Sequence, residues 1–234
     1  MPLPSALEAV LVALFPPRCV GCERHLAARP GHGLCHACLE ILEPNLGRRC
    51  ARCDLPTNES LCADCAARTP AFDHTRAAYI YGGPLVEIIL ASKFRGREDL
   101  ALSAGQLLAA DELANELARD ADGIVPVPLG RARRRERGYN QAAIMARELS
   151  RVWRIPIVYC LERVRNTKPQ SDLPLARRRE NVASAFTAKP VSGRLLLVDD
   201  VVTSAETANA AASALKTAGA TGVTVIALAR AVLE

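Results

Sequence analysis

Two adjacent carboxylates follow an apolar run near the C-terminal end of the sequence. The stretch Leu195–Thr207 reads Leu-Leu-Leu-Val-Asp-Asp-Val-Val-Thr-Ser-Ala-Glu-Thr, and an alanine-rich helical pattern follows it. The run is too short for a helix and lacks polar alternation, so it predicts a parallel strand buried on both faces. Ligands of such sheets bind beyond the carboxyl ends of the strands, where Asp199 and Asp200 are expected to lie.

The segment after these carboxylates has the features of an anion site. Thr203, Ser204 and Thr207 lie where the next helix should begin. Backbone N–H groups without partners and the positive end of the helix dipole favour an anion at such a position. Carboxylates that accept hydrogen bonds from sugar hydroxyls, next to a helix start that binds phosphate, describe a ribose 5-phosphate site. The alternative is a generic strand end that holds a metal or accepts a phosphoryl group.

Positive charge is concentrated in one part of the chain. Residues 131–180 contain fourteen Lys and Arg against five Asp and Glu, whereas residues 1–70 contain seven of each. Such a surplus suits a polyanionic ligand, either pyrophosphate or nucleic acid. A run of arginines within it is either a solvated basic face or a set of phosphate contacts, and the use of Arg over Lys favours planar recognition of phosphate. The run comprises Arg131, Arg133, Arg134, Arg135 and Arg137.

Eight of the nine cysteines form four pairs with the same two-residue gap. Two such pairs supply the tetrahedral set of thiolates that zinc prefers, so the sequence predicts two structural zinc ions. Disulfides are the alternative, and the absence of a secretory signal argues against them. Sequential pairing would give two stacked zinc ribbons, while interleaved pairing remains open. In the sequential arrangement the ligand sets are Cys19, Cys22, Cys35 and Cys38, and Cys50, Cys53, Cys62 and Cys65.

Helical and strand periodicities begin where the cysteine pairs end. We therefore expect a module of residues 1–70, made of a helix at Ser5–Leu14 and the zinc ribbons, followed by a domain of residues 71–234. Alternating strands and helices predict a doubly wound parallel α/β sheet in the second domain. The expected strands are Ala77–Tyr81, Gly123–Pro128, Ile155–Cys160, Arg194–Val198 and Val223–Leu228. The expected helices include Leu85–Phe94, Asp99–Leu117 and Gln141–Arg151, the last capped by Asn140.

Membrane and export signals are weak in this sequence. No stretch approaches the roughly 20 apolar residues needed to span a bilayer. The apolar segment Leu7–Phe15 has no positive region before it and no small-residue cleavage site after it. We expect a cytoplasmic protein.

Four parts of the sequence together resemble the ComF family (ComFC and GntX-like proteins), which combines a double zinc ribbon with a type I phosphoribosyltransferase domain. The stretch Leu195–Thr207 resembles the motif that binds phosphoribosyl pyrophosphate. The other three parts are Val125–Leu129 followed by Arg137–Ala142, Thr167–Ser171 continuing through Arg178 and Asn181 to Phe186, and the cysteine pattern. The resemblance covers nearly the whole chain.

The resemblance implies a role for each matching residue. Asp199 and Asp200 would be the catalytic pair, which holds the ribose hydroxyls and stabilises positive charge at the anomeric carbon. Mg2+ would accompany the pyrophosphate, and a flexible loop at 166–183 would close over the ligand. The residues implied to bind the 5-phosphate are Val201, Val202, Thr203, Ser204, Ala205, Glu206 and Thr207. Those implied near the pyrophosphate or on the closing loop are Pro128, Leu129, Arg131, Arg137, Lys168 and Arg178.

The chain departs from the family pattern at one position. The family motif usually has glycine where this chain has Ala205. A Cβ there restricts positive φ and close approach of the backbone. Glu206 also adds a negative charge beside the anion site. The sequence therefore leaves open whether catalysis is retained.

Two functions remain at this point. The first is a phosphoribosyltransferase-like protein that binds phosphoribosyl pyrophosphate or the phosphates of single-stranded DNA. It would serve DNA uptake in natural competence or DNA processing, with a helicase or recombination protein as partner. The alternative is an active phosphoribosyltransferase of nucleobase or nucleotide metabolism, whose acceptor no motif identifies. Few aromatic residues are available to stack on bases, and Tyr139 is equally compatible with simple packing.

Overall fold

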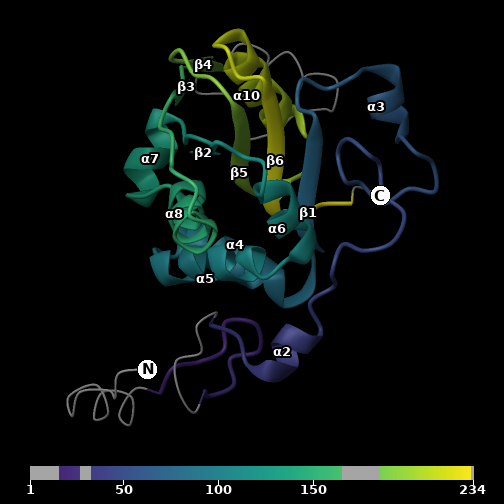
Figure 1. The fold of residues 1–234 in the computed structure, drawn as a ribbon. Coiled ribbons are helices and arrows are strands. Elements are labelled where there is room, and N and C mark those ends of the chain that lie inside the picture. The colour runs from purple at the N-terminus through teal and green to yellow at the C-terminus, as the bar shows by residue number, and fades with distance from the viewer. Residues whose placement is uncertain (1–15, 27–32, 165–184, 233–234) are drawn as a thin grey trace.

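The computed structural model describes residues 16–26, 33–164 and 185–232 (Figure 1). The expected N-terminal helix Ser5–Leu14 and the expected closing loop at 166–183 lie outside the described residues. Two short helices precede the α/β part of the chain. The helices are α2 (His36–Glu40), α3 (Ala63–Ala67), α4 (Gly83–Phe94), α5 (Glu98–Ala109), α6 (Glu112–Ala118), α7 (Arg131–Arg137), α8 (Gln141–Trp153) and α10 (Glu206–Thr217). The strands are β1 (His74–Ile80), β2 (Gly123–Pro126), β3 (Leu161–Arg163), β4 (Phe186–Ala188), β5 (Arg194–Val202) and β6 (Gly222–Arg230).

The central sheet has four strands in the order β1-β6-β5-β2, and every neighbouring pair is parallel. Residues alternate between two apolar cores along each strand. In β5, Leu196 and Val198 face one core while Leu195 and Leu197 face the other. A strand buried on both faces needs apolar residues at successive positions, which explains the unbroken apolar run that the sequence shows.

Helices cover both faces of the sheet, as the doubly wound prediction requires. The first core contains residues of α4, α5, α6 and α8, and the second contains residues of α10 and the β3–β4 pair. Asn140 caps α8 as expected, because its side chain accepts a hydrogen bond from the Ala142 N–H. The parallel α/β fold predicted from the sequence is confirmed.

Two expected elements differ from the structure. Ile155–Cys160 does not form a full strand: a single parallel bridge joins Ile157 to Ile124, and the strand that follows, β3, pairs antiparallel with β4 in a separate sheet. The helix expected over Asp99–Leu117 is broken between α5 and α6. There Asp111 accepts a hydrogen bond from the Ala114 N–H and caps a new helix, which the apolar periodicity alone did not indicate.

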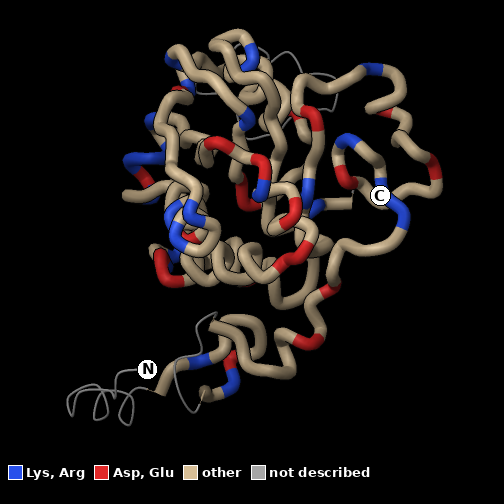
Figure 2. Tube along the Cα trace, viewed as in Figure 1, with Lys and Arg blue, Asp and Glu red and all other residues tan. Residues whose placement is uncertain are grey.

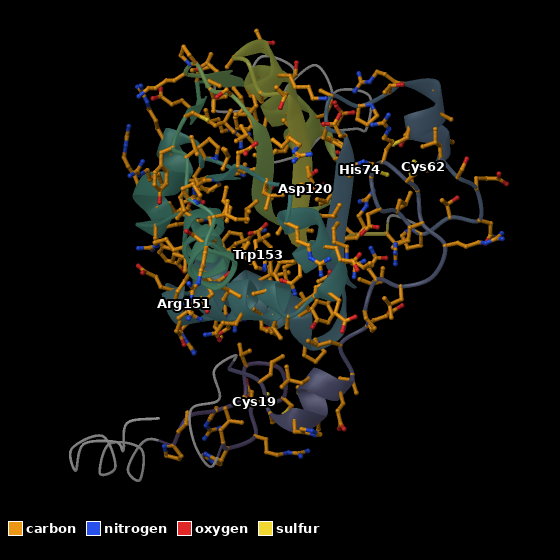
Figure 3. The ribbon with its side chains drawn as sticks, viewed as in Figure 1. Cys19, Cys62, His74, Asp120, Arg151 and Trp153 are labelled. Atoms are coloured by element: carbon orange, nitrogen blue, oxygen red, sulfur yellow. The ribbon has the colours of Figure 1, made fainter. Side chains whose placement is uncertain are left out.

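The eight paired cysteines form two clusters in sequential order, so the interleaved pairing is excluded. We call the cluster of Cys19, Cys22, Cys35 and Cys38 the first ribbon, and that of Cys50, Cys53, Cys62 and Cys65 the second ribbon. Cysteines of the first ribbon lie in the same core as α4 and α5, and those of the second lie in the opposite core with α10. Figure 3 labels one cysteine of each ribbon and shows them well apart. The expectation of two stacked ribbons was therefore wrong.

The chain between the ribbons runs along the outer edge of β1. The Asn45 N–H donates to the Ala78 carbonyl at 2.9 Å, and the Ile80 N–H donates to the Glu43 carbonyl at 2.8 Å. This segment pairs the edge strand of the sheet, which would otherwise present free hydrogen-bonding groups. It also explains the separation of the ribbons, because the chain passes over the edge from one face to the other. The domain boundary at residue 70 stays a prediction.

None of the helices within the described residues has the length and apolar character needed to cross a membrane.

Candidate functional site

Asp199 and Asp200 lie near the C-terminal end of β5, at the carboxyl end of the parallel sheet. Strand β5 continues to Val202, so both carboxylates are part of the strand rather than beyond it. The Asp200 N–H donates to Asp199 Oδ1 at 2.9 Å. Lys93, in the last turn of α4, places its Nζ 2.8 Å from Asp200 Oδ1. A strand end and a helix end therefore bring two carboxylates and one ammonium together.

The two carboxylates repel each other when both are ionised, so the pair favours a ligand that brings hydrogen-bond donors or a cation. Burial and the neighbouring charge of Asp200 raise the pKa of Asp199 to about 7, against the opposing effects of Lys93 and the Asp200 N–H. Two carboxylates side by side resist simultaneous ionisation. Hydroxyl donors or a cation supplied by a ligand would relieve that repulsion.

The residue before α10 has a left-handed backbone conformation, which glycine adopts more easily than any other residue. Ala205 precedes α10 as its N-cap and has φ 60° and ψ 3°, in the left-handed region. The Cβ that the sequence introduces at this position therefore does not prevent positive φ. The conformation costs an alanine about 1–2 kcal/mol relative to ordinary helical backbone.

A cavity of about 580 Å³ opens at this end of the sheet, and we call it the sheet-end cavity. Its size falls in the range of small-molecule sites. It brings together most of the residues that the sequence selected from distant parts of the chain. Those residues are Pro128, Leu129, Arg137, Asp199, Asp200, Val201, Val202, Thr203, Ala205 and Thr207.

Arginines supply positive charge to the same cavity as the carboxylates. Arg133 and Arg137 of α7 and Arg163 of β3 line it. Burial is the main cause that lowers the pKa of Arg137 and of Arg163. The Nε of Arg137 is buried and has no hydrogen-bond partner among the described residues. A bound anion would offset the desolvation of these cations and accept a hydrogen bond from the Nε of Arg137.

Three predicted residues of the site have a different surrounding from the one expected. Arg131 is exposed at the start of α7 and is not part of the cavity lining. Ser204 and Glu206 line a second cavity of about 340 Å³ on the other side of the loop, between the loop and the second ribbon. We call it the ribbon-side cavity. Lys168 and Arg178 lie outside the described residues.

Glu206, which adds a negative charge near the expected phosphate, is paired away from that position. Arg68, just after α3 of the second ribbon, places its Nη2 3.1 Å from Glu206 Oε2 and 3.2 Å from Oε1. The Glu206 side chain is 12% exposed and that of Arg68 57%. The ion pair therefore offsets the carboxylate charge that the sequence placed beside the anion site.

Sequence reasoning missed Lys93, Arg163 and Phe94 as parts of the cavity. Phe94 is 63% exposed, and the guanidinium of Arg137 lies 4.9 Å from its ring centroid. Lys93 lies near the end of α4 and Arg163 at the end of β3. No motif in the sequence around either residue indicates an anion site. Tyr139 does not present its hydroxyl to the cavity, because that hydroxyl donates to the Ser92 carbonyl of α4.

The geometry of both ribbons fits a tetrahedral metal. The four sulfur atoms of each ribbon lie within 4.8 Å of one another. Cys22 and Cys35 have their Sγ atoms 3.7 Å apart, and Cys53 and Cys62 have theirs 3.6 Å apart. Zinc–sulfur bonds of 2.3 Å in a tetrahedron place neighbouring sulfurs about 3.8 Å apart. No histidine belongs to either cluster in the described part of the chain, and the ninth cysteine, Cys160, is a buried core residue.

Arginine side chains also gather outside the cavity along α7. Arg131, Arg134 and Arg135 are exposed on this helix, and Figure 2 shows basic positions concentrated there. Arg133 and Arg137 of the same helix are partly buried and line the cavity. One short helix therefore carries cations both into the cavity and onto the adjoining surface.

Comparison with known proteins gives matches to the ribbons and to the whole chain. Residues 10–66 match the model of the double zinc ribbon domain. Among solved structures, glutamine phosphoribosylpyrophosphate amidotransferase from Bacillus subtilis aligns with 58% of this chain and 30% of its own, at 22% identity and a TM-score of 0.40.

Two curated relatives align along nearly their full length. Competence protein F of Haemophilus influenzae is 30% identical over 92% of this chain and 97% of the relative. DNA utilization protein YhgH of Escherichia coli is 32% identical over the same shares of the two chains. With two clusters of ribbon cysteines, a parallel α/β sheet and relatives of this extent, the chain belongs to the ComF family.

Proposed function

We propose that this protein binds a phosphoribosyl ligand, with phosphoribosyl pyrophosphate as the principal candidate, in the sheet-end cavity. One observation carries the proposal: a carboxylate pair, a helix start and partly buried arginines meet in the same cavity. Each group matches one part of the ligand. Sugar hydroxyls suit the carboxylates, a terminal phosphate suits the helix start, and a diphosphate suits the arginines.

Different residues would bind different parts of the ligand. Asp199 and Asp200 accept hydrogen bonds from the ribose hydroxyls, with Lys93 holding the Asp200 carboxylate in place. The backbone N–H groups at the start of α10 face a 5-phosphate. The side chains of Ser204 and Glu206 line the other cavity, so these two residues act through their backbone.

Arg133, Arg137 and Arg163 would bind the pyrophosphate on the opposite side of the cavity. The unused Nε donor of Arg137 gives that group a definite contact to make. Mg2+ would neutralise charge on the pyrophosphate, and the oxygen ligands that it prefers are available from Asp199 and Asp200. The lowered pKa values of Arg137 and Arg163 would return toward normal when the anion binds.

Calorimetric titration with phosphoribosyl pyrophosphate and Mg2+ tests this proposal. We expect saturable binding to the wild-type protein and at least a tenfold loss of affinity in Asp199→Asn/Asp200→Asn, which keeps the side-chain shape but removes the charged acceptors. Asp120→Asn is the matched control, because its side chain is 78% exposed and makes only a 3.8 Å ion pair with Arg194. Equal affinity in wild type and double variant would overturn the assignment.

The biological role that we propose is the use of DNA taken up by the cell. It rests on the relatives, whose names are competence protein F and DNA utilization protein. We place the protein in the cytoplasm, where a helicase or recombination protein would be the partner. Co-purification from cells induced for DNA uptake, compared with a strain lacking residues 1–66, would test whether the ribbons dock that partner.

Direct binding of single-stranded DNA is a second candidate, favoured by the exposed arginines beside the cavity. Arg131, Arg134 and Arg135 offer phosphate contacts that a small ligand inside the cavity does not need. Such contacts act through counterion release, so affinity should fall steeply with salt.

Two variants separate the DNA surface from the small-ligand site. Arg131→Ala/Arg134→Ala/Arg135→Ala should weaken binding of a labelled oligonucleotide and flatten its salt dependence, while phosphoribosyl pyrophosphate binds as before. Arg133→Ala/Arg137→Ala should weaken phosphoribosyl pyrophosphate more than the oligonucleotide. Fluorescence anisotropy over a salt series measures the first ligand and calorimetry the second. If the triple variant binds the oligonucleotide as tightly as the wild-type protein does, these arginines do not form a DNA-binding surface.

The remaining alternative is an active phosphoribosyltransferase. A nucleophile would then displace pyrophosphate at the anomeric carbon, with the anionic pair Asp199 and Asp200 stabilising the positive charge that develops there. Release of pyrophosphate from phosphoribosyl pyrophosphate in the presence of a nucleobase or ammonia would support it. Stable binding without such release would assign the protein a binding role alone.

A further inference from the structure

Arg230 is a buried cation between the second ribbon and the proposed phosphate loop. It is the last residue of β6 and is 4% exposed. Its Nε donates to the Cys53 carbonyl at 3.0 Å, and its Nη1 donates to the Val202 carbonyl at 2.9 Å. The same Nη1 also donates to the Thr203 carbonyl. The guanidinium of Arg230 thus joins Cys53 of the second ribbon to Val202 and Thr203, where β5 ends and the loop begins.

The charge of Arg230 has no carboxylate partner within 4.0 Å among the residues that the structure describes. A buried cation normally needs an anion, because desolvation otherwise destabilises it strongly. Nη2 of Arg230 lies 3.8 Å from Cys53 Sγ of the second ribbon, and the buried carboxylate of Asp54 also interacts electrostatically with Arg230. Four thiolates around one Zn2+ would carry net negative charge, so a metal-loaded ribbon would add to Asp54 as counter-charge for Arg230.

Further contacts join the same ribbon region to the start of α10. Arg68 pairs with Glu206 at 3.1 Å, and the Ala71 N–H donates to Asn209 Oδ1 at 2.7 Å. Glu206 and Asn209 lie in the first turn of α10, directly after the loop. The loop is therefore held from the ribbon side at its beginning by Arg230 and at its end by these two contacts.

We infer that Arg230 is a positioning residue that holds the loop at 203–205 in its ligand-binding shape, and that the metal-loaded second ribbon holds Arg230. The inference rests on the proposed phosphoribosyl site. It predicts a dependence that runs in one direction: the 5-phosphate end of the ligand depends on the second ribbon, whereas the pyrophosphate end does not. When the ribbon loses its metal, the chain at Cys53 is no longer fixed, so the Cys53 carbonyl no longer orients Arg230 and the carbonyls of Val202 and Thr203 lose their common donor.

Arg76 offers a matched control for substitution of Arg230. It is 2% exposed and also lies on a strand of the sheet beside the second ribbon. Its contacts go to Asp111, Asp54 and the Asn45 carbonyl, none of which belongs to the loop. Arg76→Lys therefore disturbs a buried guanidinium of the same region without touching the loop. Lysine at either position keeps the charge but lacks the fork of donors.

Two ligands distinguish positioning from general destabilisation. Ribose 5-phosphate needs the loop, and inorganic pyrophosphate with Mg2+ needs only the arginine side of the cavity. We expect Arg230→Lys to weaken ribose 5-phosphate at least tenfold, which corresponds to about 1.4 kcal/mol, and to leave pyrophosphate within about twofold. Arg76→Lys should change neither. Equal weakening of both ligands by Arg230→Lys, or weakening of neither, would overturn the inference.

Hydrogen exchange gives a readout that needs no ligand. The N–H of Asn209 donates to the Ala205 carbonyl at 2.8 Å, and that of Ala231 donates to the Val202 carbonyl at 2.9 Å. Both amides report that the loop is in place. They should exchange at least tenfold faster in Arg230→Lys and in Cys62→Ser of the second ribbon, but not in Cys22→Ser of the first. Unchanged exchange in Cys62→Ser protein that has lost one zinc would show that the metal does not support the loop.

The two measurements also separate this inference from the proposed function. Wild-type protein that binds neither ribose 5-phosphate nor phosphoribosyl pyrophosphate would refute the phosphoribosyl site, while the exchange of Asn209 and Ala231 would still decide whether Arg230 and the second ribbon hold the loop.

Discussion

The two ribbons use the same cysteine spacing but make different contacts with the rest of the molecule. Cys19 and Cys38 of the first ribbon lie in an apolar core with residues of α4 and α5, such as Leu85 and Leu100. The second ribbon shares the opposite core with α10 and adds polar contacts to the β5–α10 loop, through Arg230 and Arg68. The first ribbon therefore packs mainly through apolar contacts on two helices, whereas the second ribbon also makes polar contacts that support a loop.

This difference teaches that identical metal modules need not have identical roles. A module too small for a core of its own takes its folding free energy from the metal and from whatever surface it covers. The first ribbon covers apolar residues of α4 and α5. The second covers the back of the loop on which the proposed phosphate site depends. Breaking one ribbon at a time should therefore produce separable losses.

The largest effect should come from removing one buried thiolate of each ribbon. Cys19 and Cys53 are matched, since both are buried at 1% and 4% exposure. We expect Cys19→Ser and Cys53→Ser each to reduce bound zinc from two ions to one, and to lower the free energy of unfolding by on the order of 4 kcal/mol. Metal analysis and urea denaturation measure these quantities.

The same pair of variants should differ in ligand binding. Only Cys53→Ser should also lose affinity for ribose 5-phosphate, because only the second ribbon contacts the loop. A loss of the same size in Cys19→Ser would show that the ribbons are equivalent and that the comparison is wrong.

The apolar character of the first ribbon can be tested at a glycine. Gly33 has φ +66° and a Cβ added there would lie 2.6 Å from Cδ2 of Leu100, whereas Gly47 has φ +85° and open space around it. Gly47→Ala should cost about 1 kcal/mol for its left-handed backbone alone. Gly33→Ala should cost about 2–3 kcal/mol, because overpacking against α5 adds to the same strain. Denaturant titration measures both, and equal costs would mean that the first ribbon is not closely packed.

The carboxylate pair beyond the second ribbon should make ligand affinity depend on pH. Asp199 has its pKa raised to about 7, by burial and then by Asp200, and the ionised form accepts stronger hydrogen bonds from hydroxyls than the protonated form does. Affinity for phosphoribosyl pyrophosphate should therefore rise as the pH increases through 7, by about tenfold per unit well below that value.

Asp200→Asn tests the cause of this pH dependence. It removes the like charge and frees Lys93, so the pKa of Asp199 should fall and the rise in affinity should move to lower pH. Calorimetry between pH 6 and 8 measures the midpoint, and comparison of the two proteins cancels ionisation of the ligand itself. A midpoint that does not move would exclude Asp199 as the titrating group.

Much of this architecture was predictable because its causes are local in the sequence. Buried parallel strands require apolar runs, so β5 and β6 were found. Repeated cysteine pairs predicted the sequential metal clusters. The order of strand, carboxylates and hydroxyls placed Asp199, Asp200 and Thr203 at one cavity, since parallel strands end at the same edge.

The features that could not be predicted depend on contacts between distant residues. Nothing local distinguishes Lys93 from other lysines at helix ends, or Arg163 from its basic neighbours. The separation of the ribbons follows from the pairing of residues 43–45 with the edge of β1, which no periodicity announces. Arg230 did leave a signal, since a charged residue within the apolar run of β6 needs a buried partner. The sequence does not identify the partners of Arg230, because Cys53 and the loop come close to it only in the folded chain.

The smallest effect concerns the loop itself, where the chain has alanine at the position that is usually glycine in the family. Ala205 has φ 60°, and the contacts from the second ribbon on either side of it hold the loop in that conformation. Ala205→Gly should relieve the strain of the Cβ and raise the free energy of unfolding by up to about 1 kcal/mol, since glycine also gives the unfolded chain more freedom. Ala132→Gly in α7 is the control and should destabilise the protein, because α7 is helical there. If the ribbon rather than residue 205 sets the shape of the loop, Ala205→Gly should leave affinity for ribose 5-phosphate nearly unchanged while stability rises. A large gain in affinity would instead mean that the Cβ of Ala205 occupies space that the phosphate needs, and that the ribbon holds the loop in a partly closed form.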